Sequence, residues 1–196
     1  MSGGWTRMKP ALAGVGLAAL LALSACEYDP QADETDAAAR TEASTQTVAA
    51  ILGDEADLSQ LADALNEAGL AGVLDGNAPY TVFAPTNEAF GKLGDAAGEL
   101  GSEDNRAALV AVLRGHIVPG TLTRQDIADA LSGADGEAVT METMGEGPLT
   151  FGGSGDAITV TAADGTSARL AGAGTRGSNG AVIPIDAVLK DFSSGE

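Results

Sequence analysis

The chain has 196 residues, of which 28 are Asp or Glu and 10 are Lys or Arg, giving a formal net charge of −18. So few basic residues leave no positive stripe for nucleic-acid phosphates or anionic lipid headgroups. One Cys and one His exclude an internal disulfide framework, a Cys-x-x-Cys redox centre and a multi-His metal site, while a 44% hydrophobic content is enough to build a core.

Residues 1–25 are predicted to be a secretory signal. Arg7 and Lys9 precede an uncharged run of small and apolar residues that is too short to span a hydrocarbon core of ~30 Å. Residues 23–26 read Leu-Ser-Ala-Cys, which resembles the cleavage motif of bacterial lipoprotein signal peptides at all four positions. The resemblance implies that Cys26 becomes the first mature residue and carries lipid. The alternative is an ordinary signal peptide with a chance Cys.

Residues 26–44 are predicted to be a flexible acidic tether. They are rich in acidic residues, Thr and Ala, and a segment with so few large apolar side chains does not offset its chain entropy. The expected reach is roughly 20–25 Å. A helix packed on the following domain is the alternative. Removal of the signal would take away two basic residues and leave a charge of −20.

The next segment, up to about residue 135, has apolar residues at helical spacing. We expect helices marked by Val48, Ile51 and Leu52; by Leu58, Leu61, Ala62 and Leu65; by Phe90; by Leu109, Val112, Leu113 and His116; and by Ile127 and Leu131. Their predicted N-caps are Asp57 or Ser59, Thr86, Ser102 and Thr123. Gly69 and Gly72 are expected to end the second helix.

Strand patterns dominate the second half of the chain. After an early strand at 80–84, alternating stretches lie near 138–143, 148–151, 157–162 and 166–170, and an apolar run covers 181–189. Helices followed by strands predict an α+β domain, and the absence of a repeat predicts one copy over residues 45–192. Because Pro184 cannot donate a ladder hydrogen bond, we expect the last strand to be at an edge or bulged there.

Three segments carry a family resemblance. Residues 80–90 read YTVFAPTNEAF, residues 113–120 read LRGHIVPG, and residues 179–189 read NGAVIPIDAVL. Together they resemble the fasciclin domain over roughly residues 44–192. The resemblance implies short helices packed on a wedge-shaped β-sandwich. The positions that match the family motifs, to which we assign structural roles, are Thr81, Phe83, Pro85, Thr86, Asn87, Phe90, His116, Asn179, Gly180 and Asp186.

The residue types at these positions favour structural roles. Phe83 and Phe90 suit a core on either side of a strand-to-helix corner, where Pro85 fixes φ and Thr86 caps the helix. Asn87 is short and polar, which suits hydrogen bonding to the backbone. The pair Asn179-Gly180 is typical of a turn before a strand, and Asp186 is expected to accept backbone or hydroxyl hydrogen bonds.

The chain departs from the family pattern at three places. Gly115 stands where the family usually has Tyr, and Ile183 stands where it usually has His. Animal members have an Asp-Ile dipeptide, implicated in integrin binding, just before the closing segment. Residues 174–177 here read Gly-Thr-Arg-Gly, so integrin-type adhesion is not implied.

Candidate chemistry is sparse. His116 is the only imidazole, no Gly-x-Ser-x-Gly motif accompanies it, and a lone His on an apolar helix face is more often structural. Residues 172–177 spell a GxGxxG motif, but no helix pattern follows to hold a pyrophosphate. The acids at 54–57 and 103–104 lack calcium-loop spacing. We therefore predict no catalytic residues, metal, cofactor or nucleotide.

These observations predict a lipid-anchored bacterial envelope protein. It would be held at the inner or outer membrane, with its domain in the periplasm or at the cell surface. Its function would be adhesion or protein–protein interaction with an unknown protein or matrix partner, as the family resemblance implies. The alternative is a periplasmic small-molecule or polysaccharide-binding module, which a well-formed apolar pocket would favour. An enzyme would need a perturbed acid–base pair beside a cleft.

Overall fold

The computed structural model describes residues 44–192. The predicted signal at 1–25, the lipidation site Cys26 and the predicted tether up to residue 43 lie outside the described residues. Within the described part, no helix is long and apolar enough to cross a membrane.

The helices occupy the first half of the described chain. They are α1 (Val48–Asp54), α2 (Ser59–Glu67), α3 (Ala71–Leu74), α4 (Asn87–Gly91), α5 (Asp95–Leu100), α6 (Arg106–Gly115) and α7 (Arg124–Gly133), with single 3₁₀ turns at Ala56–Leu58, Glu103–Asn105 and Gly155–Ala157. Each of the expected helices is present. Two were not predicted, α3 and α5, and both are too short to show a clear helical period.

The strands form two four-stranded sheets, and the domain is α+β as predicted. The first sheet has the order β2-β1-β8-β7, with β1 (Tyr80–Pro85), β2 (Ile117–Pro119), β7 (Thr175–Gly177) and β8 (Gly180–Ile185). The second has the order β3-β4-β5-β6, with β3 (Val139–Glu142), β4 (Pro148–Gly152), β5 (Thr159–Thr161) and β6 (Ser167–Arg169). All pairings are antiparallel except that of β1 with β8, the two most distant strands in sequence of the first sheet.

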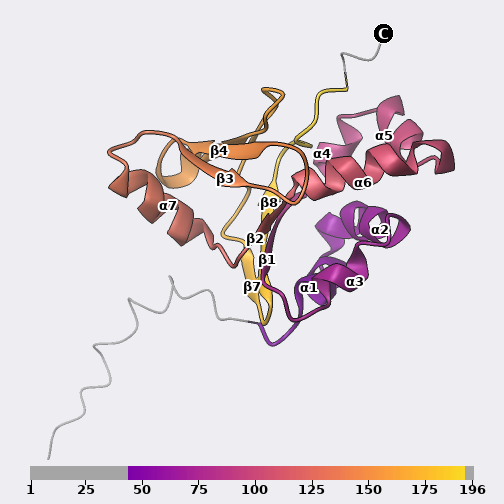
Figure 1. The fold of residues 1–196 in the computed structure, drawn as a ribbon, viewed down its shortest axis with the longest axis horizontal. Coiled ribbons are helices and arrows are strands. Elements are labelled where there is room, and N and C mark those ends of the chain that lie inside the picture. The colour runs from indigo at the N-terminus through magenta and orange to yellow at the C-terminus, as the bar shows by residue number, and fades with distance from the viewer. Residues whose placement is uncertain (1–43, 193–196) are drawn as a thin grey trace, which may run out of the picture. The chain divides into compact units, whose positions relative to one another are not determined.

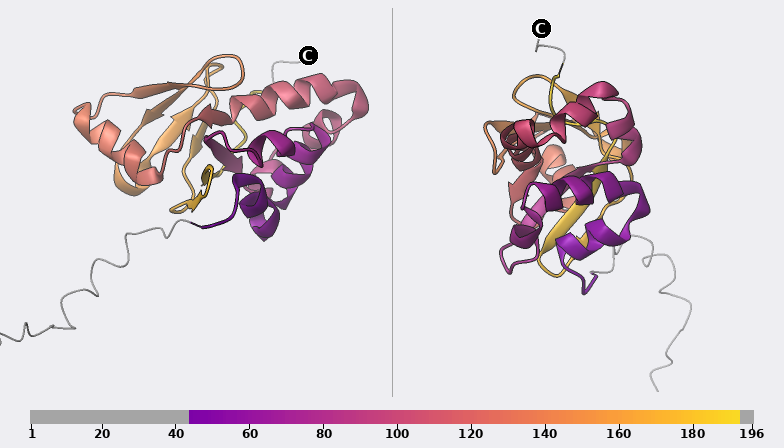
Figure 2. Two further views of the ribbon diagram at one scale, coloured as in Figure 1. Left: turned by 60° about the horizontal axis from the view of Figure 1, so that its bottom comes forward. Right: turned by 90° about the vertical axis from the view of Figure 1, so that its right-hand side faces the viewer.

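The first sheet is the middle layer of the domain, with α1–α6 on one face and the second sheet on the other (Figures 1 and 2). Its central strands alternate accordingly, because successive side chains point to opposite faces. Val82 and Val182 pack among the helices, while Phe83 and Ile183 pack against the second sheet and α7. The Phe83 ring lies 5.2 Å from the Phe151 ring of β4, centroid to centroid. The middle layer therefore carries two separate cores.

Two predicted helix caps are confirmed. The Thr86 hydroxyl accepts the N–H of Ala89 at the start of α4. Thr123 begins α7 with a capping box, in which its hydroxyl accepts the N–H of Asp126 and the Asp126 carboxylate accepts the N–H of Thr123. In each case the threonine directly precedes the first residue of the helix, and no 3₁₀ turn lies between them.

The other predicted caps are wrong. α2 follows a 3₁₀ turn and has Leu58 at its N-cap position, so neither Asp57 nor Ser59 caps it. Ser102 precedes another 3₁₀ turn, and its hydroxyl donates back to the carbonyl of Glu99 instead of capping α6. Gly69 follows α2 in a left-handed conformation, φ 72°, whereas Gly72 lies within α3 instead of ending α2.

The prediction for Pro184 is confirmed in part. β8 as a whole lies between β1 and β7, and its register with β1 runs unbroken from Gly180 to Ile185, so the strand is not bulged. At Pro184 itself, however, β8 has no β7 partner. Proline is tolerated because β7 pairs only with residues 180–182. Beyond the end of β7, the Pro184 carbonyl accepts the N–H of Ala171, 2.7 Å away.

Candidate functional site

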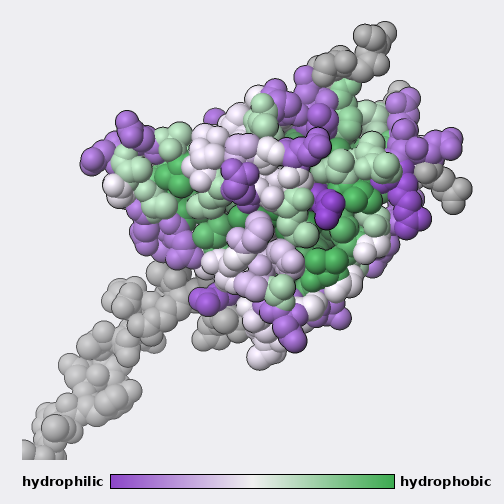
Figure 3. All heavy atoms as spheres, in the orientation of Figure 1, coloured by the Kyte–Doolittle hydropathy of each residue, from purple (hydrophilic) through white to green (hydrophobic). Residues whose placement is uncertain are grey.

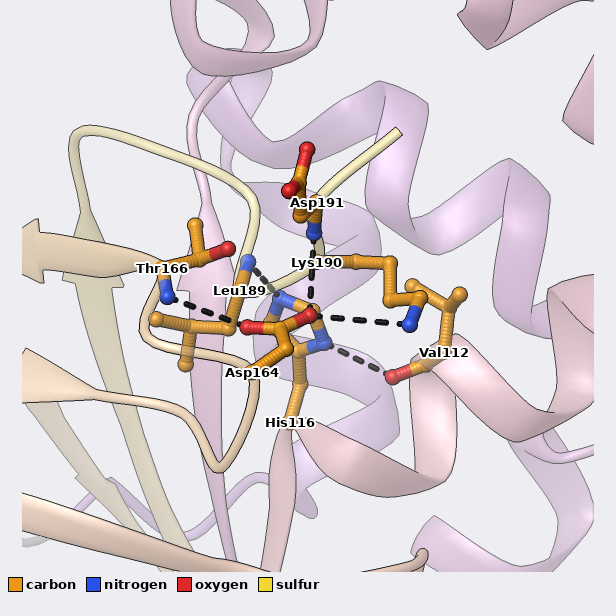
Figure 4. Close-up of polar contacts among 7 residues, drawn as sticks. All are labelled: Val112, His116, Asp164, Thr166, Leu189, Lys190 and Asp191. Atoms are coloured by element: carbon orange, nitrogen blue, oxygen red, sulfur yellow. Dashed lines mark hydrogen bonds and ion pairs between the residues drawn. The ribbon is translucent and has the colours of Figure 1, made fainter. Parts of the chain in front are cut away.

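His116 follows the last residue of α6 and is almost fully buried, at 1% exposure. Its Nδ1 lies 2.8 Å from the carbonyl oxygen of Val112, and its Nε2 accepts the backbone N–H of Leu189 at 2.9 Å (Figure 4). Because a backbone N–H can only donate, Nε2 is the unprotonated nitrogen and Nδ1 carries the proton. The imidazole therefore joins the end of α6 to the segment that follows β8.

Burial lowers the pKa of His116 from 6.5 to about 4, although the hydrogen bond to Val112 opposes the shift. The ring is neutral at physiological pH, and both of its nitrogens are used within the fold. It has no free nitrogen to offer a substrate as a general base, which requires hydrogen-bond reach of the reacting proton.

A second polar link holds the same C-terminal segment. Asp164, in the turn between β5 and β6, accepts the backbone N–H groups of Thr166 and Asp191, each at 3.0 Å, and lies 3.5 Å from the Lys190 ammonium (Figure 4). Partial burial would raise the pKa of this carboxyl, but the two backbone N–H groups, the Thr166 side chain and the Lys190 charge together hold it below 3.8. The sequence analysis did not single out Asp164. The pair Asp164-Gly165 is typical of a turn, and this pair could have drawn attention to it.

Asn87 connects α4 to α2. Its side-chain oxygen accepts the N–H of Gln60 at 3.1 Å, and its amide donates to the Ala56 carbonyl at 2.8 Å and to the Ser59 hydroxyl at 3.1 Å. The expectation that Asn87 bonds the backbone is confirmed, but the backbone belongs to a segment 27–31 residues earlier. Asn87 thus supplies from outside the N-terminal hydrogen bond that α2 lacks.

Asn179 and Gly180 connect the start of β8 to the helical layer. The Asn179 side chain accepts the N–H of Val48 at 2.8 Å and donates to the carbonyls of Leu74 and Gly76. Gly180 has φ 154°, and a Cβ there would lie 1.8 Å from the carbonyl oxygen of Tyr80. No residue with a side chain fits this position.

The remaining motif residues sit at similar junctions. Thr81 is fully buried, and its hydroxyl donates to the Gly120 carbonyl and accepts the N–H of Leu122, both at 2.8 Å. Asp186 accepts the N–H of Arg169 at 2.7 Å, the expected backbone hydrogen bond, and so ties the end of β8 to β6. Phe83 and Phe90 are buried on opposite sides of the first sheet, on either side of the corner that Pro85 begins.

The structure does not bring these residues together in one cleft. Each of them fixes a different junction between segments, and only His116 contacts the C-terminal segment that Asp164 also holds. The GxGxxG segment runs into β7 and then directly into β8, without a helix. Within the described residues, no group of three or more His, Cys, Asp or Glu side chains is placed to hold a metal ion.

A pocket of about 430 Å³ adjoins the His116 and Asp164 links. Its walls come from the end of α5, from α6, from the β3–β4 turn with the start of β4, from the β5–β6 turn and from the C-terminal segment. They include Leu100, Ala108, Ala111, Val112, Gly115, Pro148, Leu149, Ala162, Ala163, Leu189 and Phe192, with Glu146, Asp164 and Lys190 as the charged residues. Gly115, one of the departures from the family pattern, lines it. The motif analysis did not predict this pocket, because its walls come from five segments that are separate in sequence.

The family model named Fasciclin domain matches residues 56–191 of this chain. The chain belongs to the fasciclin domain family. It is 30% identical over 153 residues to Protein sll1483 of Synechocystis sp., a match that covers 74% of each sequence. Fasciclin domains are in general non-catalytic modules associated with adhesion and protein–protein interaction.

A solved structure shares the fasciclin fold. It is a FAS1 domain pair from the insect cell adhesion molecule Fasciclin I, with a TM-score of 0.66 and 17% identity, and the match covers 76% of this chain. The chain spans about half of that structure, 52%, because the latter contains a pair of domains. At this identity the likeness concerns the fold.

Proposed function

We propose that this protein is a lipid-anchored envelope protein whose single fasciclin domain mediates adhesion or protein–protein interaction. The observation that carries the adhesive function is membership of the fasciclin family over residues 56–191. The Leu-Ser-Ala-Cys sequence at 23–26 supports the anchor. Two or more acyl chains on Cys26 would hold the protein at the membrane almost irreversibly.

The surface of the described domain suits weak, repeated contacts. Val73, with 38% of its surface accessible, is the one large apolar side chain of the described domain that is well exposed. In the view of Figure 3, hydrophilic residues gather over α7 and around the outer ends of α5 and α6. Polar regions of this kind give modest affinity per contact, and many anchored copies would raise the overall avidity.

The edges of the two sheets indicate where contacts would form. The β7 edge is already occupied near Arg176 by the N–H of Ser44. The outer strand β3, by contrast, alternates half-buried Val139 and Met141 with exposed Thr140 and Glu142. We propose β3 and the neighbouring loops as the contact surface. The Glu142 charge would keep this edge from indiscriminate strand pairing.

Two experiments test this function. Labelled palmitate should be incorporated into the wild-type protein and absent from the Cys26→Ala variant. Incorporation that survived the substitution would contradict the anchor.

Crosslinking in intact cells followed by partner identification tests the adhesive role. We expect a protein or matrix component to be recovered. Recovery of only a soluble metabolite would contradict adhesion. None of the side chains named here is given a catalytic role, because the sole imidazole is buried and fully hydrogen-bonded.

A further inference from the structure

The pocket beside α6 has the size and lining of a small-ligand site. Its volume of about 430 Å³ falls in the range of roughly 300–1,000 Å³ that such sites occupy. Most of the lining side chains are apolar, and the charged ones are few. We propose that this pocket binds a small amphiphile with an apolar body and a cationic head group. The site is independent of the adhesive function.

Two glycines shape the wall at the end of α6. A Cβ at Gly115, which lines the pocket, would meet nothing within 4 Å, so the missing side chain leaves open space there. A Cβ at Gly145 would lie 2.7 Å from the backbone nitrogen of Gly115. The β3–β4 turn therefore packs directly on the α6 backbone, and this contact fixes the distance between two walls.

The C-terminal wall is held in place before any ligand arrives. Leu189 is tied to His116 through its N–H, and Asp191 is tied to Asp164 in the same way. Leu189 and Phe192 contribute apolar side chains to the pocket on either side of these links. A preformed pocket avoids much of the cost of ordering loops on binding.

The charges around the pocket select the head group. Asp164 already pairs with Lys190 and with two backbone N–H groups. Glu146 is the remaining charged lining residue, and it forms no ion pair within the described residues. The whole chain has a formal net charge of −18, which attracts cations and repels anions. An ammonium group beside Glu146, with its apolar body against α6, matches this arrangement.

The experiment compares three probes that share one apolar body: 3-phenylpropylammonium, 3-phenylpropanol and 3-phenylpropanoate. Each is titrated into the purified full-length protein by calorimetry, and a buffer titration is subtracted. We expect the ammonium to bind best and the carboxylate to bind about tenfold more weakly, because its charge opposes that of Glu146 and of the chain.

Variants locate the binding site. Gly115→Tyr fills the pocket and should weaken binding of the ammonium and the alcohol about tenfold or more. Gly98→Tyr is the matched control, because Gly98 is also a helical glycine with open space at its Cβ but does not line the pocket. Ala111→Leu fills the same pocket from a second position on α6, so the outcome does not depend on one variant.

A charge variant tests the head group separately. Glu146→Gln should weaken ammonium binding about threefold, the effect of losing an exposed ion pair, and leave alcohol binding unchanged. Glu137→Gln, an exposed acid outside the pocket, should change neither. The proposal is overturned if no probe binds at millimolar concentration, if the carboxylate binds as well as the ammonium, or if Gly115→Tyr and Ala111→Leu leave ammonium binding intact.

Discussion

At the scale of single residues, polar side chains stabilise the fold by joining segments that are far apart in sequence. His116 reaches Leu189, Asn87 reaches residues 56–60, and Asn179 reaches Val48. Each is part-buried or buried, so removal of the side chain leaves backbone groups without partners. Such losses cost about 1–3 kcal/mol each, which is a large share of a domain's stability.

The neutral state of His116 makes stability depend on pH. The unfolded chain takes up a proton below pH 6.5, whereas the folded chain does so only near pH 4, so stability falls as pH decreases between these values. The loss is about 3 kcal/mol when the pH has passed below 4. Denaturant unfolding at pH 7, 5.5 and 4.5 measures it. A flat profile between pH 6.5 and 4.5 would contradict the assignment.

The acidic residues serve as an internal control for this experiment. Asp126 and Asp164 have pKa values lowered below 3.8, the first chiefly by the backbone and hydroxyl of Thr123. Their contribution is lost mainly as the pH falls through 3.8 and below it. An Asp164→Asn variant should therefore keep the decline between pH 6.5 and 4.5.

Asn87→Ala should lower the free energy of unfolding by about 1–2 kcal/mol, because α2 loses an external cap and two carbonyl or hydroxyl groups lose a donor. Asn77→Ala, at an exposed position, should stay within about 0.5 kcal/mol of wild type. Chemical denaturation of both variants provides the comparison. Equal stability of the two variants would refute the capping role.

At the scale of elements, the end of α6 is the most informative junction. Gly115 closes the helix, the Gly145 turn packs against its backbone, and His116 ties it to the segment after β8. The same junction forms one end of the pocket. Substitutions at the end of α6 are therefore expected to affect both the packing of the domain and the volume of the pocket.

Two glycine substitutions at this junction should have opposite signs. Gly115→Ala should raise the free energy of unfolding by about 0.5–1 kcal/mol, since the position is helical and open. Gly145→Ala should lower it by about 2 kcal/mol, because the new Cβ presses on backbone atoms that cannot move aside. Thermal unfolding of both proteins measures the difference. A stabilising effect of Gly145→Ala would contradict the close packing.

The sequence predicted elements with a clear period and missed those without one. Apolar spacing located α1, α2, α6 and α7, and alternation located β3 to β6, because several residues repeat in each. β2 and β7 have three residues each, and unlike β5 and β6 they do not lie within a longer alternating stretch of the sequence. The environment of Pro184 could be predicted only in part, since it depends on where β7 ends. Among the site residues, Asp164 and the pocket walls meet only through tertiary contacts.

At the scale of the whole molecule, the described domain begins and ends at opposite ends of the first sheet. Ser44 lies beside β7, whereas the pocket and the C-terminal segment lie beside α6 (Figure 1). A lipid at Cys26 would be linked to the domain through the β7 end.

Adhesion of intact cells tests the central claim, that the anchored domain makes contacts at the envelope. Cells lacking the protein should adhere to each other or to a matrix-coated surface several-fold less than wild type. Expression of the wild-type chain should restore adhesion, whereas Cys26→Ala, which would remove the proposed lipid anchor, should not. Adhesion that is unchanged by loss of the protein, or fully restored by Cys26→Ala, would contradict the account.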